Sequence, residues 1–258
     1  MIKEDIRFQN SCFFEGMTSI RAIIAAHDAG INSRRINKVL YSRDRIMKIS
    51  KDVGYLRAVS QKYGFELIES SDEELDKLTL GSSHGGIVAE AFERELPYLD
   101  ASASIIENGF YAMIQGIEDP YNFGYSLRSL YASGCSGIIL PERNWMSAAG
   151  VVCRSSAGAS ELFPIFKSEP INAVKHFKAL GYKVVCADER TDNVLGKCDI
   201  RLPVLLIVGG ERRGISRELL EFCDVRIKIE YAREFKASLS AASATTMFAY
   251  EIMRQNFN

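Results

Sequence analysis

Short apolar segments, each followed by a helical pattern, dominate the second half of this 258-residue chain. The apolar segments do not alternate with polar residues, so we expect both faces of each strand to be buried. Strands of this kind, separated by helices, are typical of a parallel sheet covered by helices on both sides. The sequence therefore predicts an α/β fold. From residue 108 the expected strands are FYAMIQGI, GIIL, YKVVCAD, PVLLIVGG and VRIKIE, and the expected helices are 122–133, EPINAVKHFKALG, ISRELLEFC and the tail from Ser238.

The first hundred residues show the same alternation in a smaller unit. A helix over FEGMTSIRAIIAAHDAG should end at Gly30, because glycine readily adopts the positive φ found after a helix. The periodic pattern stops over RELPYLDASAS, residues 94–104, around a proline and small residues. We therefore expect an N-terminal domain at 1–96 and a second domain at 105–258. The other elements expected in the first domain are INKVLYS, FELIE and HGGIVAEAF as strands and SKDVGYLRAVSQKYG and SDEELDKLT as helices.

Composition excludes several protein classes. The charged start MIKEDIRFQN lacks the apolar run of a signal peptide, and the run around PVLLIV is too short to cross a bilayer, so we expect a cytoplasmic protein without a membrane segment. The chain has 32 Lys and Arg against 33 Asp and Glu, which neither suggests nor excludes nucleic acid. The cysteines form no C-x-x-C pair, so we expect reduced thiols and no metal site. They are Cys12, Cys135, Cys153, Cys186, Cys198 and Cys223.

Local charge is less even than total charge. Residues 31–60 carry eight basic and two acidic side chains, a net charge of +6. This pattern fits a solvated helix face with its loops, and it also fits a patch that contacts phosphates, because backbone neutralisation needs clustered charge. If the patch binds RNA, the candidates are Arg34, Arg35 and Lys38.

The segment YNFGYSLRSL, residues 121–130, places Asn122 and Arg128 six residues apart. On a continuous helix this spacing is about 600° of rotation, so the two side chains would not share a face. Either the pairing is accidental, or Asn122 lies at a helix entrance while Arg128 projects from the next turn.

A second segment, LLIVGGERRGIS (205–216), joins a buried strand to a helix through a glycine-rich loop. Glycines after a parallel strand let the backbone approach a ligand at the carboxyl edge of the sheet. The spacing is not that of a dinucleotide fingerprint. A tight strand-to-helix turn would give the same pattern.

A third segment, FKASLSAASATTMFAYE (235–251), is rich in small residues over 237–246. A flat ligand or a neighbouring backbone could approach this helix start closely. It could equally be a tightly packed helix with Ser238 as its cap.

In this order, the three segments resemble the motifs of the SpoU (TrmH-like) family of RNA ribose 2′-O-methyltransferases, in the SPOUT superfamily. NFGYSLR resembles N-x-G-x-x-x-R, VGGERRGI resembles G-x-E-x-x-G-hydrophobic, and IKIE…SLSAASA…YE resembles I-P-M…S-L-N with a closing Y/F-E. The segment SSAGASELFPI (155–165) is similar to the family's sequence between the first two motifs. The resemblance covers about residues 105–256, and the pattern around HGGIVAE is similar to the ribosomal-protein-like RNA-binding domain that many members carry.

This resemblance implies an α/β methyltransferase domain with a trefoil knot in its C-terminal half, S-adenosylmethionine as cofactor, a homodimer, and RNA as substrate. Ribosomal RNA is the preferred substrate because of the appended N-terminal domain, with transfer RNA as the alternative. By matching position, the implied cofactor-binding residues are Gly209, Gly214, Ile229 and Leu239. The implied catalytic residues are Asn122, Arg128, Glu211 and Ser238, with Arg128 also contacting RNA.

The third motif departs from the family pattern. Ser240 stands where the family has asparagine, and Glu230-Tyr231 stand where it has Pro-Met. This departure leaves open a catalytically weakened RNA-binding relative. A third alternative is an unrelated α/β enzyme whose Gly209–Gly214 loop binds nucleotide phosphates.

Overall fold

The computed structural model describes residues 13–79, 82–141, 148–210 and 214–257. It divides into two compact units: unit 1 is Met1–Glu95 with Asn144–Leu162, and unit 2 is Leu96–Arg143 with Phe163–Asn258. The boundary after Glu95 falls in the segment expected to be a linker. The stretch ending at Leu162 also belongs to unit 1, although it lies inside the expected second domain. No sequence pattern predicted this return of the chain to unit 1.

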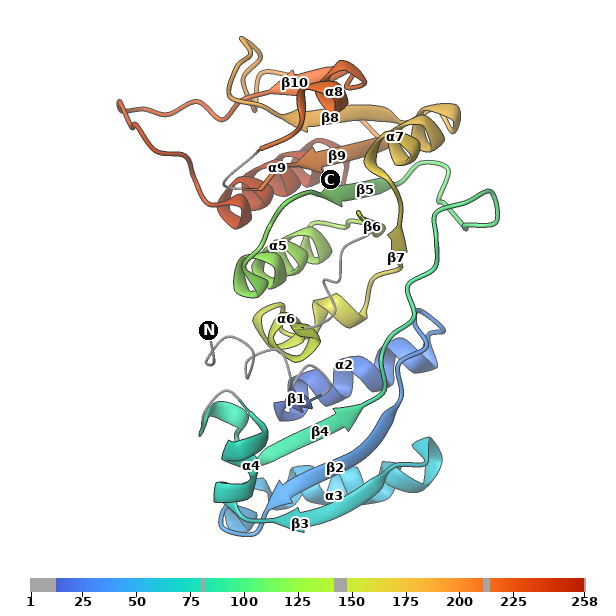
Figure 1. Cartoon of the computed structure of the whole chain (residues 1–258), viewed down its shortest axis with the longest axis vertical. Helices are drawn as coiled ribbons and strands as arrows, with labels where there is room; N and C mark the ends of the chain where they lie inside the picture. The colour runs from blue at the N-terminus through green and yellow to red at the C-terminus, as the bar shows by residue number, and fades with distance from the viewer. Residues whose placement is uncertain (1–12, 80–81, 142–147, 211–213, 258) are drawn as a thin grey trace. The chain divides into compact units, whose positions relative to one another are not determined.

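Unit 1 is built on a four-stranded mixed sheet in the order β1-β4-β2-β3 (Figure 1). Neighbours β2 and β3 are parallel, whereas β4 is antiparallel to both β1 and β2. Strand β1 overlaps the expected helix start. It pairs with β4 at the sheet edge and buries Phe14 in the core, and the helix begins only after Glu15. The strands are β1 (Phe13–Glu15), β2 (Ile36–Ser42), β3 (Glu66–Ser70) and β4 (Ile87–Ala91).

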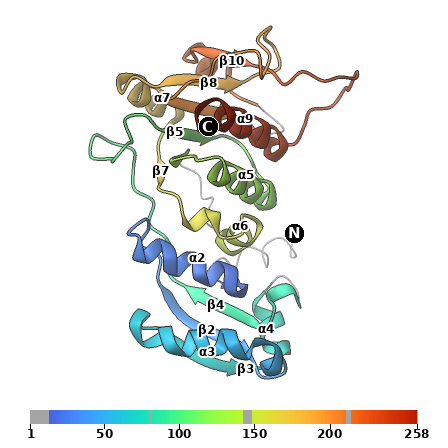
Figure 2. The same ribbon diagram turned by 180° about the vertical axis from the view of Figure 1, so that it is seen from behind.

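Helices α2 and α3 run beside this sheet, α2 along β1 and β4, and α3 along β2 and β3 (Figure 2). Helix α3 ends at Tyr63 and is followed by Gly64, which has a φ of +71°. Helix α4 begins with a capping box in which Ser71 and Glu74 satisfy each other's backbone N–H groups. The helical elements of unit 1 are α2 (Gly16–Asp28), α3 (Ile46–Tyr63), α4 (Asp72–Leu78), η1 (Ser82–His84), α6 (Ala149–Ser155) and η3 (Ala159–Glu161).

The core of unit 1 explains why the later stretch belongs to it. Ala149 and Cys153 of α6 are buried among the side chains of α2, α3 and the sheet. Gly158 makes room for α2, because a Cβ there would lie 2.6 Å from the Cβ of Ala22. Helix α6 was not predicted from the sequence.

Unit 2 contains a fully parallel six-stranded sheet in the order β10-β8-β9-β5-β6-β7. The parallel sheet and its α/β class confirm the prediction from the apolar segments. Strand β7 was not predicted, because its three residues follow no recognisable helix–strand boundary. The strands are β5 (Phe110–Ile114), β6 (Gly137–Leu140), β7 (Ile165–Lys167), β8 (Lys183–Ala187), β9 (Val204–Val208) and β10 (Val225–Ile227).

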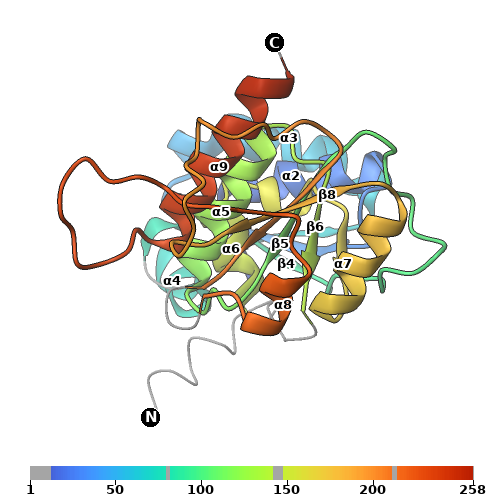
Figure 3. The ribbon, with the colours of Figure 1, turned by 90° about the horizontal axis from the view of Figure 1, so that it is seen from above.

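Helices cover both faces of this sheet (Figure 3). On one face, α7 and α8 bury Phe177 and Leu219 against alternate strand residues such as Leu205 and Ile207. On the other face, α5 and α9 pack against each other, and the Ser129 and Thr246 hydroxyls lie 2.6 Å apart. The helices are α5 (Pro120–Ala132), α7 (Pro170–Ala179), α8 (Arg217–Glu221) and α9 (Ala241–Asn256). Within the described ranges no helix is long and apolar enough to cross a membrane.

Candidate functional site

A cavity of about 710 Å³ opens in unit 2 at the carboxyl ends of β8, β9 and β10. This is the edge at which parallel α/β sheets bind ligands. All four residues predicted to bind the cofactor line this one cavity, although they come from three separate segments. They are Gly209, Gly214, Ile229 and Leu239.

The cavity wall after β9 is made of backbone. A Cβ on Gly209 would lie 2.5 Å from the Gly214 carbonyl carbon, and a Cβ on Gly210 would overlap the Gly116 carbonyl. Gly214 has a φ of +59°, and its N–H donates to the Gly210 carbonyl over 3.0 Å. Side chains are therefore excluded here on steric grounds, and a ligand in the cavity meets bare backbone. Glu211 lies outside the described residues.

The turn after β8 supplies charge that the sequence motifs did not indicate. Asp188, Glu189 and Arg190 line the cavity, and the Asp188 carboxylate accepts hydrogen bonds from the backbone N–H and the Nε of Arg190. Asp188 is 9% exposed. The expected strand YKVVCAD ends at Asp188. Because ligands bind at the carboxyl ends of parallel strands, this position could have identified Asp188 as a candidate site residue.

The start of α9 forms another wall. Ser238 and Leu239 line the cavity, with Ser238 exposed. Ser238 is not the helix cap: that role belongs to Ser240, whose hydroxyl accepts a hydrogen bond from the Ser243 N–H at 3.1 Å. The expected cap was two residues too early because either serine suits the position. Ser240 thus has a structural role that asparagine could also fill.

Asn122 and Arg128 lie on α5 and are not among the lining residues of this cavity. The helix begins at Pro120 with Asp119 as cap, so Asn122 sits in the first turn, and its N–H donates to the Asp119 carboxylate. Arg128 is exposed, and the described residues give it no ion pair. It shares an exposed stripe with Tyr121 and Tyr125, as the i, i+4, i+7 spacing requires.

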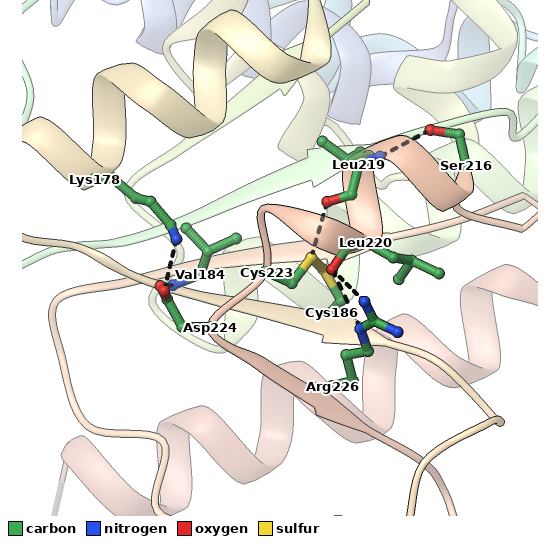
Figure 4. The surroundings of a disulfide bond; sticks show 9 residues. All are labelled: Lys178, Val184, Cys186, Ser216, Leu219, Leu220, Cys223, Asp224 and Arg226. Carbon is green, nitrogen blue, oxygen red and sulfur yellow. Dashed lines mark hydrogen bonds and ion pairs between the residues drawn. A yellow bond between two sulfur atoms is a disulfide. The ribbon is translucent and has the colours of Figure 1, made fainter.

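A disulfide joins two elements that border the cavity (Figure 4). Cys186 in β8 is bonded to Cys223, which follows α8. This overturns the expectation that both are reduced thiols; nothing in the sequence pairs two cysteines 37 residues apart. The same turn is anchored by Asp224, whose carboxylate accepts from the Val184 N–H and pairs with Lys178 at 2.7 Å.

The predicted RNA-contacting set in unit 1 needs a correction. Arg34 is 2% exposed and its Nε donates to the Glu161 carboxylate at 2.9 Å, so its side chain is not available to a phosphate. Arg35 is exposed, and Lys38 is half-buried and paired with Glu90 at 2.7 Å. A count of charges along the sequence cannot separate a buried arginine from its exposed neighbour.

No cluster of three or more potential metal ligands among His, Cys, Asp and Glu occurs in the part of the chain that the structure describes. The cavity offers glycine backbone, apolar side chains and a few charges, which suits an organic ligand.

Comparison with known families decides what kind of protein carries this cavity. The model of the SpoU rRNA methylase family matches residues 109–250, which is more than half of the chain. The chain belongs to the SpoU methylase family. Membership removes the alternative of an unrelated nucleotide-binding enzyme, and the matched range contains the first two motifs and the third as far as Tyr250.

Curated SpoU relatives match along most of the chain. A putative TrmH family tRNA/rRNA methyltransferase from Bacillus subtilis, YacO, is 27% identical over 241 residues, covering 89% of this chain and 96% of the relative. A 23S rRNA (guanosine-2′-O-)-methyltransferase from Shewanella oneidensis, RlmB, is 28% identical over 203 residues, covering 76% of this chain and 81% of the relative.

Solved structures share the fold of this SpoU chain. The SpoU methyltransferase AviRb from Streptomyces viridochromogenes, in complex with AdoMet, aligns with a TM-score of 0.75 at 24% identity, over 96% of this chain and 97% of that one. An AdoMet-bound rRNA methyltransferase from Sinorhizobium meliloti aligns with a TM-score of 0.77 at 23% identity, over 98% and 94% of the two chains.

Proposed function

We propose that this protein transfers a methyl group from S-adenosylmethionine (AdoMet) to a ribose 2′-hydroxyl of RNA. The observation that carries the proposal is the cavity of about 710 Å³ in the part of the chain matched by the SpoU family. Its lining contains every residue that the family resemblance assigned to the cofactor. The activity is the one named for the Shewanella relative, and two fold neighbours were crystallised with AdoMet.

The residues of the cavity fit AdoMet. Gly209 and Gly210 leave the backbone bare, so a flat ring can lie against it. Ile215, Leu220 and Ile227 give the cavity apolar walls. The carboxylates of Asp188 and Glu189 suit a ligand that carries a sulfonium and an ammonium group. When bound, AdoMet supplies an electrophilic methyl group.

Arg128 is the residue for which we propose a direct role in the reaction. A ribose hydroxyl is a poor nucleophile, so much of the rate comes from holding its oxygen in line with the methyl group. Negative charge develops on that oxygen as its proton leaves, and a fixed guanidinium stabilises it. A guanidinium group donates hydrogen bonds and carries positive charge, so the proposed role of Arg128 is electrostatic. Asn122, Ser238 and Glu211 are proposed to orient the reacting groups.

A homodimer would explain why Arg128 lies outside the cavity lining. The exposed stripe of α5 that carries Arg128 also carries Tyr121 and Tyr125, which are 46% and 48% exposed. The packed helix α9 adds Met247 and Tyr250, at 42% and 55%. Aromatic and methionine side chains are enriched at interfaces. We propose that two copies associate across α5 and α9, which places Arg128 in the interface.

Sedimentation velocity tests this association. Tyr125→Glu and Tyr250→Glu introduce charge into the proposed interface and should give a monomer that no longer transfers methyl groups. Leu180→Glu changes a 47%-exposed apolar side chain at the end of α7 and should leave the dimer intact. A wild-type monomer would contradict the proposal.

We also propose the trefoil knot of the family. The support is the strand order, in which β9 lies between β8 and β5, and the return of the chain from β10 to pack α9 on α5.

Unit 1 is proposed to bind the RNA, with ribosomal RNA preferred and transfer RNA as the alternative. The contacting residues are taken from the exposed cations, Arg35 together with Lys48 and Lys51 of α3. Neutralising Lys48 and Lys51 should weaken RNA binding and lower the salt slope of log K by about 1 for each phosphate that is no longer neutralised. AdoMet affinity should not change. An unchanged slope would contradict the patch.

The decisive experiment is transfer of labelled methyl groups from AdoMet to RNA from cells that lack the gene, followed by mapping of 2′-O-methyl positions. Transfer to ribosomal RNA is expected; transfer only to transfer RNA would select the alternative. The second candidate function, a catalytically weakened RNA-binding relative, rests on Ser240 in place of asparagine. If this candidate is right, Arg128→Ala leaves the cellular role of the protein unchanged. If the protein is an active methyltransferase, the same substitution abolishes that role.

A further inference from the structure

The segment between β10 and α9 departs from the family pattern and lies at the cavity. It leaves unit 2 as a long loop (Figure 3), and residues 230–238 are all exposed. Exposed positions in a loop are ordinarily polar, yet Tyr231 is 39% and Phe235 58% exposed. Their rings contact each other with centroids 6.0 Å apart at an angle of 63°. Two large aromatic rings in water point to a binding role.

Tyr231 connects this aromatic pair to the cavity. Its side chain lines the cavity, and its hydroxyl accepts a hydrogen bond from the Leu239 N–H at 3.1 Å. Leu239 lines the cavity as well. The hydroxyl therefore holds the loop at the cavity edge, while the ring supports Phe235 from one side and leaves more than half of that side chain open.

The charges beside the pair favour an anion. Arg233, Glu234 and Lys236 lie next to Phe235 in the chain and are exposed, with a net charge of +1, and no ion pair to either cation occurs in the described ranges. The acidic Glu230 is compensated by Lys197 at 3.1 Å. Aromatic rings that stack on unpaired bases, with cations beside them for phosphates, are the usual means of binding single-stranded nucleic acid.

We propose that Tyr231 and Phe235 form a stacking platform for a base of the RNA substrate, unpaired and next to the ribose that is methylated, with Arg233 and Lys236 contacting its phosphates. This inference rests on the proposed function and names the substrate feature recognised: a single-stranded nucleotide at the cavity mouth. The platform is a positioning device, because a base stacked there keeps the ribose near the methyl donor.

A substitution series at Phe235 tests the platform, since this residue does not line the cavity and its exposed side chain can be changed without disturbing the core. Stacking on an aromatic side chain corresponds to about a 5- to 150-fold change in affinity. Phe235→Ala should raise KM for RNA by that factor while the AdoMet Kd stays within two-fold. Phe235→Leu, apolar but without a π-face, should behave like the alanine variant, and Phe235→Trp should restore wild-type KM. Leu180→Ala is the control for removal of an exposed apolar side chain.

Ultraviolet crosslinking of wild-type protein to the same RNA gives a readout independent of activity. A nucleotide adduct on the peptides between Lys228 and Lys236 is expected, and its loss in Phe235→Ala supports the platform.

An unchanged KM in Phe235→Ala, wild-type behaviour of Phe235→Leu, or adducts only on other peptides would overturn the platform. A change of sedimentation without a change of RNA affinity would also overturn it, because the loop would then contact protein. If the wild-type protein transfers methyl groups to RNA and the Phe235 variants have the wild-type KM for RNA, only the platform is wrong. If no RNA is methylated, the proposed function is wrong as well.

Discussion

Removal of the Glu161 carboxylate should destabilise unit 1 strongly. The Glu161 and Arg34 side chains are 1% and 2% exposed, and the Arg34 Nε lies 2.9 Å from the carboxylate. Arg34 also donates to the Phe92 carbonyl at 2.8 Å, and its guanidinium lies 4.7 Å from the Phe14 ring centroid. A second buried arginine, Arg94, is close enough for its pKa to respond: burial lowers this pKa to about 10, and Glu161 opposes the shift.

The magnitude follows from these charges. With Glu161→Ala, two buried guanidinium groups lose their carboxylate, and breaking a buried pair in this way costs about 3–5 kcal/mol. At a urea m-value of about 2–3 kcal/mol/M, the midpoint of unfolding should fall by about 1–2.5 M. The double variant Arg34→Met/Glu161→Leu should recover part of this loss, because it removes the Arg34 charge together with the carboxylate and leaves only the buried Arg94 charge without that carboxylate.

Urea unfolding followed by far-ultraviolet circular dichroism measures the loss, and hydrogen exchange of β2 and α6 peptides assigns it to unit 1. Asp52→Ala is the matched control in the same unit, because it breaks the Arg21 pair at 3.2 Å between side chains that are 59% and 37% exposed. That change should cost about 1 kcal/mol or less. If Glu161→Ala costs no more than Asp52→Ala, the assignment of a buried, stabilising pair is wrong.

Three further predictions concern unit 2 and the cysteines. Gly210→Ala should weaken AdoMet binding by about 5- to 150-fold in calorimetry, because the new Cβ overlaps the Gly116 carbonyl and overpacking costs about 1–3 kcal/mol. Unchanged affinity would show that the loop can shift to accommodate the Cβ. Reduction of the Cys186–Cys223 disulfide should lower stability by about 4 kcal/mol in the chain-entropy account for a separation of 37 residues, measured by urea unfolding with and without reductant. Burial raises the pKa of Cys153 to about 12. This thiol should therefore resist iodoacetamide at pH 8 in the folded protein and react with it in urea. Alkylation of the native protein at a rate near that of a free thiol would contradict the burial of Cys153.

Local patterns predicted most of the secondary structure. Strand β2 spans Ile36–Ser42, the same residues as the expected strand INKVLYS, and β9 lies within PVLLIVGG. Apolar runs, glycines after helices and serine caps depend on a few neighbouring residues, so they can be read without knowing the fold. The three-residue strands β1 and β7 were missed because each is too short to show a period, and the helix α6 was missed because no period or cap pattern marked it. Their structure is stabilised by partners from distant segments.

The sequence by itself determined the α/β class, the parallel sheet of unit 2, the family and a few of the residues that line the cavity, because motifs and apolar periods can be recognised within short segments of the chain. Tertiary structure decided the rest. It placed Arg34 in the interior beside Glu161, joined Cys186 to Cys223, and put Arg128 on an exposed stripe instead of the cavity wall. The burial and the pairing of these side chains depend on contacts between segments that are far apart in the sequence. The charge and spacing of residues within one segment cannot predict those contacts.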